Sequence, residues 1–317
     1  MNISWMKMMS YIMLIFSYNI LMFSESFFLL WFSFEMNLLS FLYIIWKEKN
    51  FCTVNSMIKY FIIQSFSSMI FLVVLMLSEV IQLMYLMLNF ISLIMLFKMG
   101  LFPFMFWLPD VVEGLSWESM ILFLTGQKII PMYVIMMMDM FYMNEIIYMT
   151  MIVGLIMMFN QISLRKFLVY SSLIHSGWML VAVKINFYYF LLYMVIYMFI
   201  MYSMLNMKNL DSFMQYKYMN NMKMFTMIII FLNLSGLPPF LGFFSKIIVL
   251  LNMYSMYLVM MMVLVLLSIL SSYIYMNYIM MIFYNKKYYD NKNINMYNIM
   301  VLMFITMLLM LFLLLML

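Results

Sequence analysis

The segments Lys98-Met-Gly-Leu-Phe-Pro-Phe104 and Asn233-Leu-Ser-Gly-Leu-Pro-Pro-Phe240 place glycine and proline inside long apolar runs. Aligned with each other, they share the pattern Gly-Leu-x-Pro-Phe. Proline lacks a backbone N–H donor and clashes with the preceding helical turn, so each segment predicts a helix that is interrupted within its length. The interrupting residues are Gly100, Pro103, Gly236, Pro238 and Pro239.

The composition indicates that these interrupted runs belong to a membrane protein. Hydrophobic residues make up 69% of the 317 positions and charged residues only 9%, whereas a soluble domain carries about 25% charged residues. A chain this apolar cannot cover itself with a polar surface, so we expect the lipid bilayer to surround most of it. The basic residues are scattered in short loops rather than striped along one face, which excludes a nucleic-acid partner.

One cysteine, Cys52, and one histidine, His175, limit the chemistry that the chain can perform. A single cysteine excludes an intramolecular disulfide, and the two residues together exclude a Cys- or His-rich metal, haem or iron–sulfur site. No glycine-rich nucleotide-binding turn follows a strand. We therefore expect no metal and no redox cofactor in this chain.

Apolar runs separated by polar breaks predict about eleven membrane-spanning helices, because one crossing of the hydrocarbon takes about 20 apolar residues. The fold class is therefore an all-α polytopic membrane protein. The predicted spans are residues 4–23, 27–46, 54–77, 81–108, 117–138, 145–163, 167–183, 187–205, 223–251, 256–283 and 298–317.

The two interrupted helices are the fourth and the ninth spans. Spans one to five and six to ten then form two five-helix repeats, residues 1–140 and 141–284, each with a broken fourth helix. Residues 285–317 add one C-terminal membrane helix. Because five is odd, the second repeat enters the bilayer from the opposite side, and the repeats are inverted, as in many secondary transporters. The simpler alternative is that proline only kinks each helix.

The basic residues between the spans predict the orientation. Twelve fall on the side of the N-terminus and only Lys184 falls on the opposite side. By the positive-inside rule, the N-terminus faces the cytoplasm or a mitochondrial matrix, and the C-terminus faces the other side. The twelve are Lys7, Lys47, Lys49, Lys59, Arg165, Lys166, Lys208, Lys217, Lys223, Lys286, Lys287 and Lys292.

Four charged residues fall inside spans: Glu35, Lys98, Lys128 and Lys246. Each charge at a helix centre costs about 2.5 to 3.5 kcal/mol on insertion scales, so packing gives no reason for them. An ionisable group that is cut off from water can exchange protons near neutral pH, which its ordinary pKa in water, about 10.4 for Lys and about 4.3 for Glu, does not allow. We therefore predict a proton relay. The alternatives are structural ion pairs and, for Lys246, a side chain that reaches toward the membrane surface.

His175 is a fifth candidate for the relay, because imidazole exchanges protons near neutral pH. It lies in the span that corresponds, by the repeat, to the span of Glu35. The neighbouring Ser171, Ser172 and Ser176 fit equally well with a histidine that is hydrogen-bonded for packing. Both interpretations remain open.

Five segments resemble one known family, from about residue 27 to 250 and in the right order. They are Trp31–Phe41, Lys98–Gly114, Gln127–Pro131, Tyr170–Trp178 and Gly236–Lys246. The family is that of NADH–ubiquinone oxidoreductase chain 2, the mitochondrially encoded, antiporter-like membrane subunit of respiratory complex I. Departures from the usual pattern occur at Phe102, Met105 and Ser245, and none removes a relay residue.

The resemblance implies a proton-translocating subunit in the membrane arm of complex I. Glu35, Lys98, Lys128 and Lys246 then stand where the family has its central relay. NAD, flavin, iron–sulfur clusters and ubiquinone are expected in other subunits, so this chain performs no redox chemistry of its own. The expected partners are other membrane-arm subunits. The expected location is the mitochondrial inner membrane, with the N-terminus in the matrix and the C-terminus toward the intermembrane space.

Two other functions fit part of the pattern. A subunit of a multi-component cation–proton antiporter has the same use for inverted repeats and buried lysines. A purely structural membrane-arm scaffold uses its charges only to hold helices together. The 51 methionines favour a mitochondrial protein of invertebrate type, because invertebrate mitochondria read an isoleucine codon as methionine.

Overall fold

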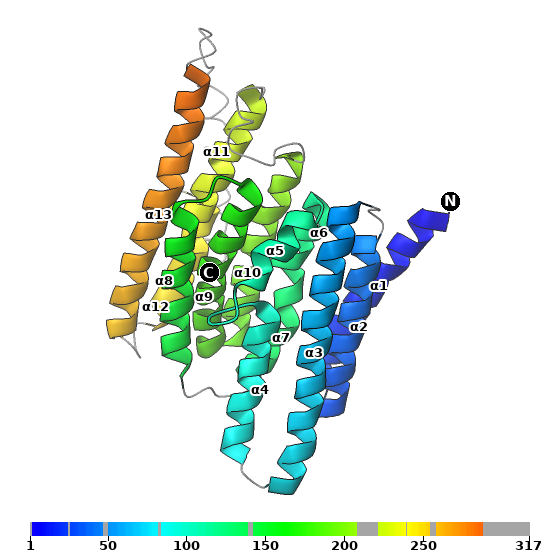
Figure 1. Ribbon diagram of the computed structural model, residues 1–317. Helices are drawn as coiled ribbons and strands as arrows, with labels where there is room; N and C mark the ends of the chain where they lie inside the picture. Colours follow the sequence, from blue (N-terminus) through cyan, green and yellow to red (C-terminus); the bar gives the residue numbers. More distant parts are fainter. Residues whose placement is uncertain are drawn as a thin grey trace. The chain divides into compact units, whose positions relative to one another are not determined.

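The computed structural model describes residues 2–24, 26–46, 50–81, 84–138, 142–207, 221–238, 240–253 and 258–287. These residues form α-helices and two short 3-10 helices (Figure 1). The helices divide into two compact units, Met1–Ile146 and Ile147–Leu317. The predicted C-terminal span 298–317 lies outside the described residues.

The first unit is a bundle of helices that pack mainly on their neighbours in the chain. Helix α1 packs on α2, α2 on α3, and α3 on both α4 and α5, while α4 also contacts α7. Large apolar side chains fill the space between them, among them Phe41 and Phe71, which are fully buried. The elements are α1 (Asn2–Met22), α2 (Phe27–Trp46), α3 (Phe51–Ile81), α4 (Met84–Met99), α5 (Trp107–Gly114), α6 (Trp117–Leu124), η1 (Gly126–Lys128) and α7 (Ile129–Met137).

The second unit is built around one enclosed helix, α9, which contacts α10 and α12. Nearly every residue of α9 from Phe167 to Val183 is buried, although its sequence is less apolar than that of the helices around it. Helix α11 packs on α13. The elements are α8 (Met143–Phe159), α9 (Leu164–Ile185), α10 (Phe187–Ser203), η2 (Met204–Met207), α11 (Asn221–Ser235), α12 (Leu241–Met253) and α13 (Leu258–Lys287).

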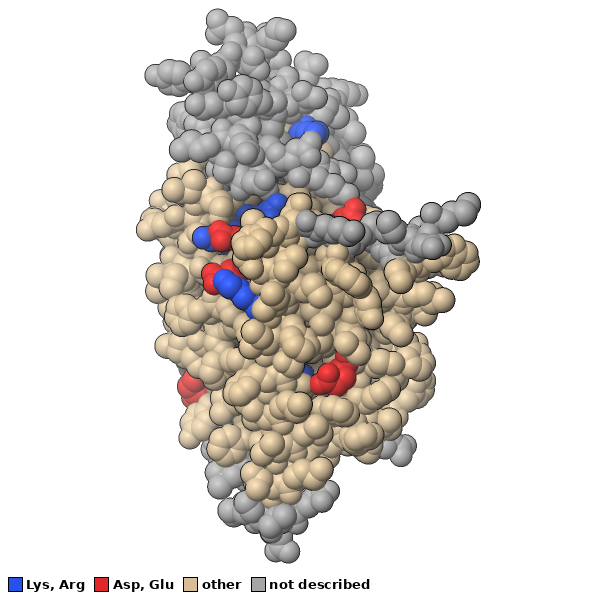
Figure 2. Space-filling view, turned by 45° about the vertical axis from the view of Figure 1, so that its right-hand side comes forward, with Lys and Arg blue, Asp and Glu red and all other residues tan. Residues whose placement is uncertain are grey.

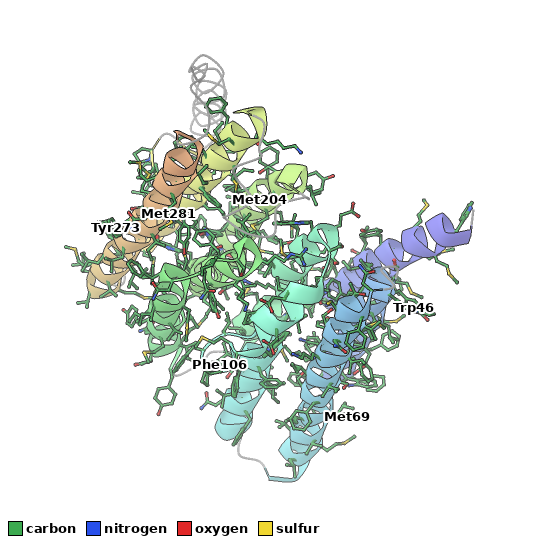
Figure 3. All side chains as sticks on the ribbon, turned by 45° about the horizontal axis from the view of Figure 1, so that its top comes forward. Trp46, Met69, Phe106, Met204, Tyr273 and Met281 are labelled. Atoms are coloured by element: carbon green, nitrogen blue, oxygen red, sulfur yellow. The ribbon has the colours of Figure 1, made fainter. Side chains whose placement is uncertain are left out.

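The outward faces of both units are apolar, as expected for helices in lipid. Large hydrophobic side chains such as Trp46, Met69, Phe106 and Tyr273 are exposed (Figure 3). The described surface seen in Figure 2 is mostly uncharged, with a few charged side chains, some of opposite sign lying side by side. Within the described residues, five helical segments are long and apolar enough to span a membrane: Phe27–Trp46, Phe51–Leu77, Trp117–Met137, Leu164–Ile185 and Leu258–Ile282.

The prediction of an all-α membrane protein is therefore confirmed for the described residues. The count of eleven spans, the inverted repeats and the boundaries 1–140, 141–284 and 285–317 stay predictions.

Both predicted interruptions occur at the predicted glycines. Helix α4 ends at Met99 and α11 at Ser235, and the glycine that follows each has a positive φ, +64° at Gly100 and +72° at Gly236. At Gly100 the termination is a Schellman motif, in which the N–H of Gly100 donates to Phe97 O and the N–H of Leu101 donates to Leu96 O. Glycine is favoured there because it adopts the left-handed conformation without steric cost.

The segment after the first interruption differs from the prediction. The expected span 81–108 ends as a helix at Met99. A separate helix, α5, covers Trp107–Gly114, where the prediction placed the last two residues of the span and the loop after it. Pro109 is compatible with this short helix because it occupies the first turn, where a backbone N–H has no helical partner. After the second interruption, the chain becomes helical again at Leu241, the first residue of α12. The backbone N–H of Leu241 donates to Asn233 Oδ1 at 3.1 Å. Pro239 lies outside the described residues.

A third interruption divides the predicted span 117–138. It was not predicted from the sequence. Helix α6 ends at Leu124, Gly126–Lys128 forms a 3-10 turn, and α7 begins at Ile129. Pro131 explains the change, because its ring clashes with the carbonyl four residues earlier and it offers that carbonyl no N–H. Gly126 and Pro131 were the available signal in the sequence.

Candidate functional site

Each unit holds a cluster of buried polar groups at an interrupted helix. The three lysines that were predicted to lie inside spans are nearly inaccessible, with exposed fractions of 6% for Lys98, 3% for Lys128 and 5% for Lys246. Lys98 lies two residues before Gly100, Lys128 lies in the turn between α6 and α7, and Lys246 is on α12, the helix that follows the second interruption. Glu35 is half-buried on α2 in the first unit.

The structure brings Lys98 together with two adjacent residues of α2. Its Nζ lies 3.7 Å from the centroid of the Phe34 ring, within the range of a cation–π interaction. The carboxylate of Glu35 interacts electrostatically with the same ammonium group. A change in the charge of Glu35 therefore alters the free energy of the charged form of Lys98.

The end of α4 supplies further interactions at Lys98. Gln64 on α3 donates from Nε2 to the carbonyl oxygen of Lys98 at 2.9 Å, which satisfies a carbonyl that the interruption at Gly100 leaves without a helical partner. The lysine also sits in the last turn of α4, where the partial negative charge of the helix terminus favours a cation. The interruption thus positions the lysine and stabilises its charge.

Lys128 is the last residue of η1, so its backbone lies in the turn between α6 and α7. The preceding residue, Gln127, exchanges two hydrogen bonds with Asn37 on α2: Asn37 Nδ2 donates to Gln127 Oε1 at 2.9 Å and Gln127 Nε2 donates to Asn37 Oδ1 at 3.2 Å. Tyr60 on α3 donates its hydroxyl to the same Gln127 Oε1 at 3.0 Å. These three side chains, Asn37, Tyr60 and Gln127, form what we call the amide clamp.

A small cavity of about 20 Å³ adjoins the amide clamp. Lys98 and Gln64 line it together with Asn37, Tyr60 and Gln127. The structure thus places Lys98 and the residue before Lys128 beside one small cavity within the first unit.

In the second unit, Lys246 points back toward the interruption that precedes it. Its Nζ donates to the carbonyl of Ser235, the last residue of α11, at 2.8 Å, and lies 5.9 Å from the centroid of the Trp178 ring. A Cβ atom added to Gly236 would lie 2.8 Å from the same Nζ. The amine of Lys246 is therefore buried and hydrogen-bonded within the second unit.

His175 lies in the enclosed helix α9 and contacts two tyrosines of α10. Its Nδ1 is 2.8 Å from the hydroxyl of Tyr193, and its ring centroid is 5.0 Å from that of Tyr197. The hydroxyls of Ser171, Ser172 and Ser176 donate to backbone carbonyls three residues earlier in the same helix. His175 is thus buried and hydrogen-bonded, as both the carrier and the packing interpretations require.

The charged residues could be predicted from the sequence, but the neutral groups beside them were not predicted. Asn37, Tyr60 and Gln127 come from three separate helices or turns, and Phe34 provides the ring that faces Lys98. The signal that was available is an amide side chain inside an apolar span, at Asn37 and at Gln127. In the part of the chain that the structure describes, no three His, Cys, Asp or Glu side chains are grouped as metal ligands.

Comparison with known proteins identifies the family of the chain. The profile of the NADH:quinone oxidoreductase/Mrp antiporter transmembrane family matches residues 24–272. The chain is 37% identical to NADH-ubiquinone oxidoreductase chain 2 of Anopheles gambiae, over 77% of this chain and 76% of the relative. It is 35% identical to the protein of the same name from Aedes aegypti, over 94% of this chain and 96% of the relative.

A solved structure shares the fold. It is a chain of respiratory complex I from Thermus thermophilus with bound aureothin, with a TM-score of 0.68 and 19% sequence identity, over 80% of the present chain. The present chain spans 65% of the length of that chain.

Proposed function

The chain belongs to the family of NADH-ubiquinone oxidoreductase chain 2, among the NADH:quinone oxidoreductase/Mrp antiporter membrane proteins, and from this premise we propose that it is a proton-translocating subunit in the membrane arm of respiratory complex I. The observation that carries the proposal is the burial of three lysines at interrupted helices inside apolar units. Family membership supports the assignment to complex I, and the buried lysines support proton transfer through this chain.

The proposed relay consists of Glu35, Lys98, Lys128 and Lys246, with His175 as a further member. A proton on a lysine amine is held less tightly when a neighbouring carboxylate is neutralised or when another ammonium comes near. At Lys98 the coupled carboxylate is Glu35. At Lys246 the Ser235 carbonyl accepts a hydrogen bond from the amine and so holds it in place. Protons then pass from group to group as the charges of their neighbours change.

Energy for the transfer comes from redox chemistry elsewhere in the assembly. NADH oxidation and ubiquinone reduction take place in other subunits, which bind the NAD, flavin, iron–sulfur clusters and quinone. This chain contributes no redox chemistry and interacts with other membrane-arm subunits in the mitochondrial inner membrane.

A second candidate function is that of a subunit in a multi-component cation–proton antiporter. It is favoured by the matching family profile, which covers Mrp antiporter subunits as well as quinone oxidoreductases. Identification of the subunits that purify with the native chain separates the two. Recovery of NADH-oxidising subunits supports complex I, and recovery of antiporter subunits alone contradicts it.

The function is tested by Lys246→Met, which keeps the length of the side chain and removes its proton. We expect the complex to assemble and its coupled NADH:quinone turnover to fall by at least roughly tenfold, because a positioned proton carrier contributes at least this much. The measurement is inhibitor-sensitive turnover per assembled complex, with proton uptake by resealed membrane vesicles.

Lys59→Met is the matched control. Lys59 is half-exposed on α3 and pairs with Asp110 at 2.8 Å, and an exposed ion pair contributes only about 0 to 1 kcal/mol. We expect turnover close to that of the natural protein. Equal losses in both variants would show that any lost lysine impairs the assembly, which contradicts a relay at Lys246 and favours the scaffold alternative.

The proposed orientation places the N-terminus in the matrix, and the only cysteine of the chain offers a test. Cys52 is exposed near the start of α3, in a region where Lys47, Lys49 and Lys59 assign the matrix side. A membrane-impermeant maleimide should label it in inside-out vesicles and leave it unlabelled in mitoplasts. Labelling in mitoplasts alone would reverse the orientation.

A further inference from the structure

The side chain of Tyr193 joins three helices of the second unit. Its hydroxyl on α10 lies 2.8 Å from His175 Nδ1 on α9 and also forms a hydrogen bond with the side chain of Ser245 on α12. The three helices contact one another, and all three side chains are buried. The protons of these groups must therefore be arranged so that each hydrogen bond has one donor and one acceptor.

Ser245 determines the direction of the bond between α10 and α12. Its hydroxyl donates to the backbone carbonyl of Gly242 at 3.0 Å. A serine hydroxyl has one proton, so Ser245 can only accept a hydrogen bond from Tyr193. Tyr193 then donates its own single proton to Ser245, and the tyrosine oxygen accepts from His175.

The same reasoning places a proton on His175. A ring nitrogen that donates to an oxygen carries a hydrogen, so Nδ1 is protonated both in the neutral ring and in the cationic ring. In the neutral ring the lone pair is then on Nε2. The hydrogen bond made by one ring nitrogen thus decides which nitrogen exchanges protons, as is general for histidine.

We propose that Tyr193 holds His175 in the Nδ1–H tautomer, and that Nε2 is the atom at which this histidine takes up and releases its proton. The inference rests on the proposed membership of His175 in the relay. A protonated group of the relay gives one proton to Nε2, which leaves that group neutral and makes the ring an imidazolium ion. Release from the same nitrogen restores the neutral ring, while Tyr193 and Ser245 keep their protons throughout. Tyr193 is therefore a positioning residue, and His175 does not conduct protons from one nitrogen to the other.

A neighbouring tyrosine of α10 provides a matched control. Tyr189 lies one turn before Tyr193, and its hydroxyl donates to Asn252 Oδ1 on α12 at 2.8 Å, in an exposed position. Tyr189→Phe and Tyr193→Phe therefore each remove one hydroxyl that joins α10 to α12, and each keeps the aromatic ring. Only Tyr193→Phe also removes the hydroxyl that faces His175 Nδ1.

We expect Tyr193→Phe to assemble normally and to lower coupled NADH:quinone turnover by roughly three- to tenfold, the effect of one lost hydrogen bond. The solvent deuterium isotope effect on turnover should increase, because proton exchange at a ring that is no longer held in place then limits the rate. Tyr189→Phe should show neither change. Equal losses in the two variants, or a loss in Tyr193→Phe with an unchanged isotope effect, would indicate a merely structural role and overturn the proposal.

The tautomer itself can be measured on the intact complex. The infrared bands of the imidazole ring differ between the Nδ1–H and Nε2–H tautomers. Because His175 is the only histidine of the chain, the difference between the spectra of the natural complex and of His175→Gln isolates this one ring. We expect the Nδ1–H form at alkaline pH and the imidazolium form at acidic pH. The Nε2–H form at any pH overturns the proposal, as does a ring whose protonation stays the same over the accessible range.

The activity of His175→Gln separates this inference from the proposed function. Loss of turnover in His175→Gln together with natural turnover in Tyr193→Phe overturns only the positioning role of Tyr193. Natural turnover in His175→Gln removes His175 from the relay, and the inference then fails with that assignment. The proposed roles of Lys98, Lys128 and Lys246 do not depend on either result.

Discussion

A chain carrying Lys128→Met is expected to assemble into its complex in near-normal amount and to lose coupled NADH:quinone turnover by roughly 100-fold, the lower range of what a positioned proton carrier contributes. Lys128 lies in the 3-10 turn between α6 and α7 and is almost fully buried. Methionine has a similar length and is apolar, so it fits the same space. The variant therefore loses the proton-carrying group with little loss of packing.

The companion variant Lys128→Arg separates charge from proton exchange. Guanidinium keeps its proton at every accessible pH, so this variant keeps a positive charge at the turn but cannot release a proton. We expect turnover per assembled complex to fall as it does in the methionine variant. Wild-type turnover and wild-type proton uptake in a fully assembled Lys128→Met complex would contradict a relay role for this residue.

The interruptions of the helices could be predicted from sequence wherever glycine and proline act locally. Gly100 and Gly236 each follow the last residue of a helix, where the left-handed conformation favours glycine, and that preference is visible in the sequence. The turn at Gly126–Lys128 has the same kind of signal in Gly126 and Pro131, but these residues are five positions apart and share no pattern with the other two interruptions. The two interruptions that share a motif were therefore predicted, and the one at Gly126–Lys128 was not.

The neighbours of the lysines could not be predicted, because they are set by contacts between distant parts of the chain. Asn37 and Gln127 are 90 residues apart, and Tyr60 and Gln127 are 67 apart. An amide in an apolar helix indicates that some partner exists, since a buried polar group without one is costly. It does not indicate which partner. The direction of Lys246 was likewise beyond the sequence, because a lysine near a span end can point to either side.

Gly242 is where the second interruption depends most on the absence of a side chain. It is the second residue of α12, and a Cβ atom built there would overlap the backbone carbonyl of Asn233 in α11. A backbone carbonyl cannot move aside by changing rotamer, so α11 and α12 would have to separate. That movement also strains two hydrogen bonds that join the helices, from Leu241 N to Asn233 Oδ1 and from Lys246 Nζ to Ser235 O.

Gly242→Ala is therefore expected to reduce the amount of assembled complex by more than about tenfold. Overpacking costs about 1 to 3 kcal/mol, each lost hydrogen bond adds about 1 kcal/mol, and losses of this size strongly lower the abundance of a protein in the cell. Gly154→Ala on α8 is the control, because its Cβ would lie 3.1 Å from a side-chain atom of Ile174 and 3.3 Å from the backbone oxygen of Tyr170, so shifts of only a few tenths of an ångström accommodate it. Alanine also favours the helix by about 1 kcal/mol. Native gel electrophoresis of membranes from both variants measures the assembled amount. Normal assembly of Gly242→Ala would show that α11 and α12 do not approach each other this closely, and the contact between Lys246 Nζ and the end of α11 would then have to be abandoned.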